Sequence, residues 1–219
     1  MNKMAEGEKP AMDVVFCIDE NYAMPCGVAL YSLLRTNQDM RVNAHILGQG
    51  LSEASKSGLA QTAQTGGAAI TFYEYASYGG GRGVLPIPKN TKLTEAVYIR
   101  LFIAHLLPRT VNKALFLDAD VLVVDCLKEL WKTDITDVPA AAVLDANCSN
   151  IHFFNRLEYD ISYGYYNSGI LLLNLTLWRN GEIARKCVDF ALKNPEKCHC
   201  PDQDVINYCL RGKIKTLPF

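Results

Sequence analysis

Short β-rich runs alternate with amphipathic stretches along the first part of the chain, and this alternation restricts the fold more than any other feature. Apolar runs at 13–18, 43–47 and 69–73 predict buried strands, while 22–36 and 52–65 predict the helices between them. Strands joined through helices pair in parallel, because each helix returns the chain to the same end of the sheet. We therefore expect an α/β protein with a mixed, mostly parallel central sheet flanked by helices.

The middle of the chain continues this pattern without a linker. Residues 78–92 are rich in Gly and Pro and predict a surface loop, 94–106 predict a helix, and 113–117 predict a fully apolar strand. No repeat or low-complexity segment interrupts them. We expect one domain over residues 12–219, preceded by a flexible polar segment at 1–11.

The composition excludes several classes of protein. The chain has 22 Lys and Arg against 23 Asp and Glu, a net charge of -1, whereas a nucleic-acid-binding surface needs an excess of clustered cations. A hydrophobic content of 49% excludes a disordered chain. The first eleven residues lack the apolar stretch of a signal peptide, and no apolar run reaches the roughly 18 residues of a transmembrane span. A cytoplasmic protein is expected.

Eight cysteines raise the questions of disulfides and of zinc. Cys17, Cys26, Cys126 and Cys148 lie in apolar segments, and we interpret them as small buried side chains. A chain of this size in the cytoplasm does not need disulfides. The cluster at 198–200 and 209 lacks the paired spacing of a structural zinc site.

Acidic residues directly follow two of the predicted strands. Ligands of a mostly parallel sheet bind at the carboxyl ends of its strands, so Asp19-Glu20-Asn21 and Asp118-Ala119-Asp120 are the first candidates for a site. Asp118 and Asp120 are separated by one residue and can both turn toward one Mg²⁺ or Mn²⁺, since these ions prefer oxygen ligands and share them with phosphates. The alternative is a turn with two solvated acids.

Two families have an Asp-x-Asp after a buried strand. In haloacid-dehalogenase phosphatases the motif lies near the start of the chain, whereas here it begins at Asp118 and no Asp-Asp pair follows. In nucleotide-sugar transferases of the GT-A type it lies about a hundred residues in, as here. The position favours the transferases.

Further motifs follow in a fixed order: 16–22 (FCIDENY), 98–101 (YIRL), 117–123 (LDADVLV) with Leu127 and Leu130-Trp131, 166–174 (YNSGILLLN) with Trp178-Arg179, and 202–204 (DQD) with Asn207. With them, the chain resembles glycosyltransferase family 8 from Met12 to Phe219. This family contains retaining galactosyl- and glucosyltransferases, including enzymes of bacterial lipopolysaccharide synthesis. The resemblance implies a GT-A type nucleotide-diphospho-sugar transferase fold.

The resemblance also implies a site for a UDP-sugar donor. Asp19 and Asn21 would bind the uracil and ribose, Arg100 would reach the donor sugar and the first Asp of the pair, and Cys17 and Ala119 would line the site. From the residues alone, Asp19 and Asn21 are equally suited to cap the following helix, and Arg100 to form a surface salt bridge.

The implied metal ligands for Mn²⁺ or Mg²⁺ are Asp118 and Asp120. The implied catalytic residues are Asp145, Asn167, Asp202 and Gln203. Asn167 equally suits a turn, and Asp202 the first turn of a helix that begins at Pro201. Because a Gln amide is a poor nucleophile, we favour a front-face substitution in which the departing phosphate oxygen helps to take the acceptor's proton. Gln203 would then stabilise a cationic sugar.

A C-terminal segment of the family has no counterpart in this chain, which we expect to be truncated. The family completes its metal site with a His in a His-x-x-Gly-x-x-Lys-Pro-Trp motif, and the chain reaches Phe219 without it. The Gly-rich run at 79–83 lacks the Lys-Ser/Thr of a phosphate loop, and we interpret it as a flexible loop and a candidate lid over the donor.

The expected activity is therefore metal-dependent transfer of a hexose, with retention, from UDP-galactose or UDP-glucose to a glycan or lipopolysaccharide acceptor. The acceptor could be a glycolipid at the inner membrane surface, with the protein peripheral to it. Two alternatives stay open, a weakly active or inactive UDP-binding fragment and a phosphatase that uses Asp118 as its nucleophile.

Overall fold

The computed structural model describes residues 9–75, 85–89, 91, 93–146 and 149–218, and within them a seven-stranded sheet of order β3-β2-β1-β4-β6-β5-β7. The strands are β1 (Ala11–Asp19), β2 (Arg41–Gln49), β3 (Ala69–Glu74), β4 (Lys113–Leu117), β5 (Ala140–Ala142), β6 (Ile170–Asn174) and β7 (Ile214–Thr216). All neighbours pair in parallel except those of β6, which runs antiparallel to both β4 and β5. The mixed, mostly parallel sheet is confirmed.

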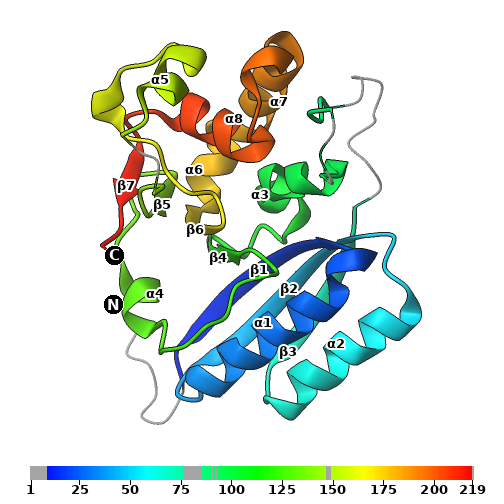
Figure 1. Ribbon diagram of the computed structural model, residues 1–219. Helices are drawn as coiled ribbons and strands as arrows, with labels where there is room; N and C mark the ends of the chain where they lie inside the picture. Colours follow the sequence, from blue (N-terminus) through cyan, green and yellow to red (C-terminus); the bar gives the residue numbers. More distant parts are fainter. Residues whose placement is uncertain (1–8, 76–84, 90, 92, 147–148, 219) are drawn as a thin grey trace.

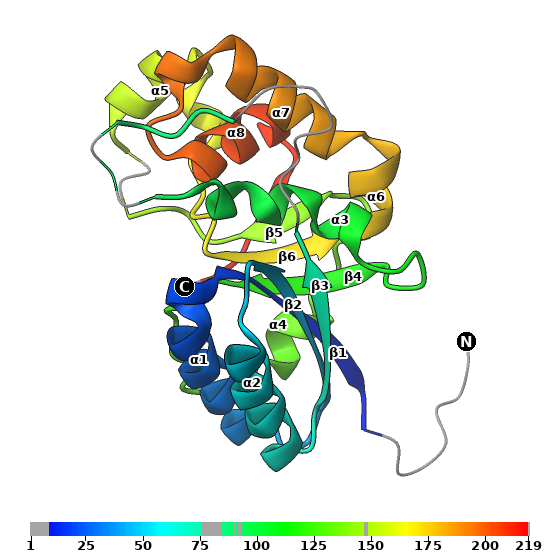
Figure 2. The ribbon, with the colours of Figure 1, turned by 90° about the vertical axis from the view of Figure 1, so that its right-hand side faces the viewer.

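Helices cover both faces of this sheet (Figures 1 and 2). One face carries α1 (Ala23–Thr36), α2 (Glu53–Thr65) and α4 (Lys128–Lys132). The other face carries α3 (Ile103–Leu106), α5 (Ile151–Leu157), α6 (Leu175–Asn180), α7 (Ile183–Lys193) and α8 (Pro201–Leu210). Short 3₁₀ helices are η1 (Glu20–Tyr22), η2 (Glu95–Phe102), η3 (Ile161–Tyr163) and η4 (Pro195–Lys197).

Each face of the sheet has its own hydrophobic core, because successive strand residues point to opposite faces. In β1, Val14 and Phe16 are fully buried against the α1 and α2 layer, whereas Val15 is fully buried in the core on the other face. The neighbouring β4 divides in the same way, with Leu115 on the first face and Phe116 on the second. Burial on both faces explains why the centres of these strands are apolar.

The helix predicted over 94–106 is mostly a 3₁₀ helix. The eight residues of η2 precede the four residues of α3. Thr94 caps η2 by accepting a hydrogen bond from the Ala96 backbone N at 3.3 Å. The β-branched Val97 and Ile99 fit an α-helix less well than straight side chains do. Runs of 3₁₀ helix this long are uncommon, and this one carries Arg100.

Other expectations are refined by the structure. The first strand begins at Ala11, which is the last residue of the segment 1–11 that we predicted to be a flexible polar N-terminus. Cys26 is buried as expected, but Cys17 is only half-buried and Cys126 is exposed, which corrects their interpretation as buried side chains. Cys126 follows two exposed residues, Val124 and Asp125, in the loop before α4. Cys148 and the Gly-rich run at 79–83 lie outside the described residues. No helix in the described part of the chain is long and apolar enough to cross a membrane.

Candidate active site

Five segments, including the ends of β1 and β4, meet at one edge of the sheet. The two strands are parallel neighbours, with Val15 opposite Phe116, so the residues that follow both strands lie at one edge of the sheet. The antiparallel β6 begins at the same edge, where the Asp118 backbone N donates to the Gly169 carbonyl at 2.8 Å. Arg100 of η2 and the first turn of α8 reach this edge as well.

Arg100 is the centre of the site. Its guanidinium lies 2.9 Å from Asp118 through Nη2 and 2.9 Å from Asp202 through Nη1, and its side chain is only 10% exposed. Nη1 also donates to the Ser168 carbonyl at 3.0 Å, and the guanidinium lies over the Phe116 ring, 4.6 Å from its centroid. Neighbouring carboxylates hold the Arg100 pKa above its usual value even though burial acts to lower it. The interaction is therefore a buried one, not the surface salt bridge that the residues alone allowed.

Asp118 and Asp120 differ in their surroundings. Burial raises the pKa of Asp118, and the negative charges of Asp202 and Asp120 add to this, while Arg100 opposes it. Asp120 is exposed, and Ala119 between them is buried at 5% exposure. Gly169 allows the Asp118 carboxylate to lie where it does, since a Cβ there would come within 2.5 Å of Asp118 Oδ2.

These two carboxylates fit a hard divalent cation. They provide oxygen ligands of the kind that Mn²⁺ and Mg²⁺ prefer, one from a half-buried and one from an exposed position. In the described ranges no three His, Cys, Asp or Glu side chains are grouped closely enough to hold a metal by themselves. A cation at this point would therefore share its coordination shell with water or with a substrate.

Asp202 and Gln203 are fixed by Ser168. The Ser168 hydroxyl donates to Asp202 Oδ2 at 2.7 Å, and its backbone N donates to Gln203 Oε1 at 3.0 Å. The other end of the Gln203 amide donates through Nε2 to Asp145 Oδ2 at 3.1 Å. Asp145 is held in turn by its backbone N, which donates to the Tyr165 carbonyl at 2.8 Å. Three of the predicted catalytic residues therefore form one connected network.

Asn167 lies in the tight turn that its sequence context indicates. Its Oδ1 accepts a hydrogen bond from the Gly169 backbone N at 2.8 Å, and its own backbone N donates to the Val143 carbonyl at 3.0 Å. The side-chain amide of Asn207 bonds both the backbone N and the carbonyl of Tyr166, at 2.7 and 2.8 Å. Asn167 is thus in the site, and α8 holds the backbone of the preceding residue, Tyr166, in place.

The predicted uridine residues lie at the end of β1. Asp19 caps η1, because its Oδ1 accepts from the Asn21 backbone N at 3.0 Å, and its Oδ2 accepts from the Thr94 hydroxyl at 3.3 Å. The Asn21 side chain is on the exposed surface. Burial raises the pKa of the Cys17 thiol, which the Arg100 charge opposes, so Cys17 is a neutral side chain beside the ion pairs. Asp19 therefore caps the short 3₁₀ helix η1 and not α1, which begins without a side-chain cap, and its carboxylate also contacts the cap of η2.

Sequence reasoning missed a second, buried layer behind these residues. Asp204 has no exposed surface and accepts hydrogen bonds from Arg156, at 2.6 Å, and from the Tyr165 hydroxyl and the Cys200 backbone N, both at 2.7 Å. Burial raises the pKa of Asp204, although all three donors oppose this. Ser168 was missed too. Both lie inside the motifs at 166–174 and 202–204, which is the signal that could have identified them.

Comparisons with known proteins agree with the fold described above. The model of the family described as "Glycosyl transferase family 8" matches residues 13–219. The chain is 27% identical over 209 residues to a putative glycosyltransferase of Haemophilus influenzae and 26% identical over 208 residues to a lipopolysaccharide 1,2-glucosyltransferase of Escherichia coli. Each alignment covers 94% of this chain, but only 61% and 60% of those proteins, so the chain spans about six tenths of their length.

A solved structure of the galactosyltransferase LgtC, in complex with donor and acceptor sugar analogs, is similar at a TM-score of 0.84 and 29% identity. The similarity covers 94% of this chain and 73% of that one. It confirms the GT-A type fold that the resemblance implied, and the family match leaves no support for the phosphatase alternative. The family model spans β1 to β7 and with them every predicted site residue, and the chain therefore belongs to glycosyl transferase family 8.

Proposed function

We propose that the chain transfers a hexose, galactose or glucose, from a UDP-sugar to a glycan or lipopolysaccharide acceptor with retention of configuration. The observation that carries this proposal is the Arg100 guanidinium, which links the carboxylate after β4 to the first turn of α8. Such an arrangement joins a candidate diphosphate site, at Asp118 and Asp120, to a candidate sugar site, at Asp202 and Gln203. Family membership and the similarity to LgtC support it.

Asp118 and Asp120 would hold Mn²⁺ or Mg²⁺. When bound, the ion would stabilise the charge that grows on the departing UDP. Arg100 would keep Asp118 in its ionised form and in position, because it donates directly to that carboxylate. Asp19, Asn21, Cys17 and Ala119 are the candidates for the nucleoside end of the donor.

Gln203 would act on the sugar by its position and by the dipole of its neutral amide. Its amide is oriented at both ends, by Ser168 and by Asp145, so it needs no rearrangement to stabilise a cationic sugar. We propose that Asp145, Asn167 and Asp202 contact sugar hydroxyls around it, and that the departing phosphate oxygen takes the acceptor's proton. LgtC has a solved active-site mutant in which a glutamine is replaced by glutamate, and Gln203 is our candidate for the corresponding residue.

The direct test measures release of UDP from UDP-galactose and from UDP-glucose, with Mn²⁺ or Mg²⁺ and with a chelator. We expect one donor to be consumed only in the presence of metal, and Asp120→Asn to remove this activity. Asp137→Asn, which removes an exposed carboxylate elsewhere, is the matched control. Activity that survives Asp120→Asn unchanged would rule out the assigned metal role.

A UDP-binding chain without transferase activity is the second candidate function. It is favoured by the lack of a complete group of three metal-binding side chains in the described residues. In that case UDP with Mn²⁺ would raise the melting temperature, but neither sugar would be released. If UDP causes no shift at all, both proposals fail. The acceptor and the cytoplasmic location, peripheral to the membrane, stay predictions.

A further inference from the structure

Two cysteines face each other between α7 and α8. Cys187 of α7 is fully buried, and Cys209, near the end of α8, is half-buried. The Cys187 thiol donates to the Val205 carbonyl at 3.8 Å and is also hydrogen-bonded to the Cys209 thiol. Val205 and Cys209 are four residues apart and therefore lie on the same side of α8. Cys187 thus packs against the turn of α8 that carries the second thiol.

The packing of the two helices holds this pair together. α7 and α8 lie side by side in both views (Figures 1 and 2). The Phe190 ring of α7 stacks on the Tyr208 ring of α8, with 3.9 Å between the ring centroids. Cys187 belongs to the hydrophobic core on this face of the sheet, and Cys209 packs against that core. The folded chain therefore brings the two thiols into contact without a bond between them.

The two thiols differ in their access to solvent. The hydrogen bond with Cys209 and burial both raise the pKa of the Cys187 thiol well above its usual value, so Cys187 is protected from reagents in solution. Cys209 is the thiol that a small reagent reaches first. A more accessible thiol beside a buried one is the arrangement in which the first is oxidised and the second completes a disulfide.

We propose that Cys187 and Cys209 are a reversible disulfide site, which a small disulfide such as oxidised glutathione closes. Cys209 releases its proton to solvent and its sulfur attacks one sulfur of the reagent, so that a mixed disulfide forms and one glutathione thiolate leaves. The Cys187 sulfur then attacks the Cys209 sulfur, and the second glutathione leaves with the Cys187 proton. Two thiols of the chain are thereby oxidised, and one disulfide of the reagent is reduced to two thiols.

The bond would join α7 to the helix whose first turn carries Asp202 and Gln203. It closes a loop of roughly 20 residues, which restricts the unfolded chain, so the melting temperature should rise by about 5–10 °C. Because the thiols are already in contact, the folded chain needs little rearrangement to form the bond. Neither the sugar donor nor a metal takes part, and the site is therefore independent of the proposed transferase activity.

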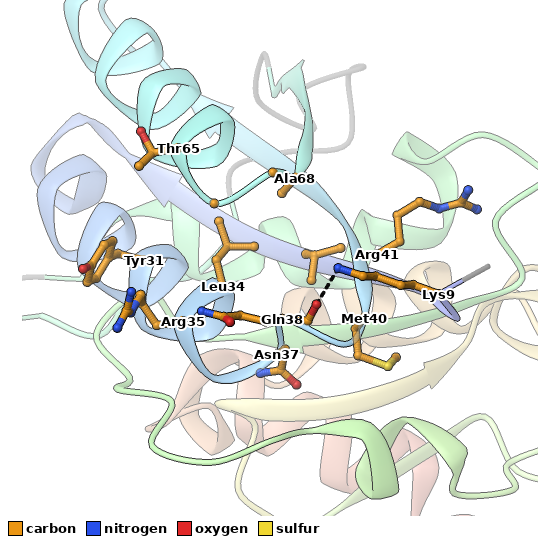
Figure 3. Close-up of a pocket in the computed structure, with 13 residues that line it drawn as sticks. Lys9, Tyr31, Leu34, Arg35, Asn37, Gln38, Met40, Arg41, Thr65 and Ala68 are labelled. Atoms are coloured by element: carbon orange, nitrogen blue, oxygen red, sulfur yellow. Dashed lines mark hydrogen bonds between the residues drawn. The ribbon is translucent and has the colours of Figure 1, made fainter. Parts of the chain in front are cut away.

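The choice of oxidant matters because the chain also contains accessible thioethers. Met24 is 79% exposed, and Met40 lines a cavity of about 600 Å³ at the other end of α1, as Figure 3 shows. A peroxide would convert such methionines to sulfoxides and change the stability by a second route. Oxidised glutathione reacts by thiol–disulfide exchange and leaves thioethers unchanged.

The test incubates the folded chain with oxidised glutathione and identifies disulfides by mass spectrometry without reduction. The exposed Cys126 and Cys200 are replaced by serine in all samples, so that they form no mixed disulfides. We expect a bond between Cys187 and Cys209 and a higher melting temperature, both reversed by dithiothreitol. A mixed disulfide that stays on Cys209, or two free thiols, would overturn the proposal and leave the pair as small buried side chains.

Cys187→Ala should prevent the bond and leave the mixed disulfide on Cys209. The matched control is Cys198→Ala, because Cys198 is a second buried thiol near Cys209 and donates to the Asn194 carbonyl at 3.4 Å. This control should keep the bond; loss of the bond in Cys198→Ala alone would assign Cys209 to the wrong partner. If Cys187→Ala does not fold, Cys209→Ala changes a half-buried position instead, and oxidised glutathione should then leave its melting temperature unchanged.

Discussion

Arg100 of η2 forms a hydrogen-bonded ion pair with Asp118 at the end of β4, with 2.9 Å between Nη2 and Oδ1. The same guanidinium lies 2.9 Å from Asp202 in the first turn of α8, so a single cation balances two carboxylates from distant parts of the chain. A planar guanidinium can do this because its donors point in fixed directions, whereas the ammonium of a lysine is a single point of charge. The geometry of the site therefore depends on one side chain.

Arg100→Met should destabilise the protein by about 3–5 kcal/mol, because it leaves the buried Asp202 and the half-buried Asp118 without their counter-charge. The free energy of unfolding of Arg100→Lys should lie between those of Arg100→Met and the parent protein, since an ammonium can reach one carboxylate but not both. Urea unfolding monitored by circular dichroism measures both. An Arg100→Met variant as stable as the parent protein would show that the ion pairs do not hold the site together.

Gly169→Ala should displace the Asp118 carboxylate. The added Cβ would come within 2.5 Å of Asp118 Oδ2, and only 3.1 Å from Asn167 Oδ1. We expect metal-dependent turnover to fall by about a hundredfold, the size of effect found when one positioned group is lost, while the fold is kept. Gly58→Ala is the control: its Cβ would meet nothing within 4 Å inside α2, so it should stabilise the helix by about 0.5–1 kcal/mol. Equal turnover in both variants would contradict this role for Gly169.

The sequence predicted the first four strands and the sheet edge because burial on both faces makes the centres of β1 and β4 apolar. It also placed Asp118 and Asp19 at that edge. It gave no prediction for the later strands β5, β6 and β7. It did not predict the 3₁₀ geometry of η2, since the apolar spacing of 94–106 fits either kind of helix. The sequence could not predict the partners of Gln203, because Ser168 and Asp145 lie 35 and 58 residues away along the chain. The antiparallel pairing of β6 in the folded sheet brings them together.

Asp204 should prove essential to the position of α8, although it does not reach the edge of the sheet. Asp204→Asn removes the charge that balances Arg156 in a fully buried position, so we expect a loss of about 3–5 kcal/mol in urea unfolding. Tyr165→Phe removes only one of the three donors to that carboxylate and should cost about 1.5–3 kcal/mol. If Asp204→Asn costs no more than Tyr165→Phe, the Arg156 charge is not what the carboxylate balances.

The stability that the ionised Asp13 contributes should be lost in acid. Burial acts to raise its pKa, but hydrogen bonds from His45, at 3.0 Å, and Asn43, at 3.1 Å, outweigh this and hold the pKa below its usual value. The folded protein therefore binds the proton more weakly than the unfolded chain does. The stability that Asp13 contributes is fully present above the unfolded pKa of about 3.9 and is lost as the pH falls through the lower, folded value.

Asp13→Asn tests this link between β1 and β2. The variant should be less stable than the parent at neutral pH, where the charged contact to His45 is lost, and the difference should shrink as the pH falls below about 4. Thermal melts from neutral to acidic pH measure both effects. Asp137→Asn removes an exposed carboxylate and should stay close to the parent throughout. A difference between Asp13→Asn and the parent that stays constant with pH would mean that packing at this position, and not the ionised carboxylate, stabilises the pairing of the two strands.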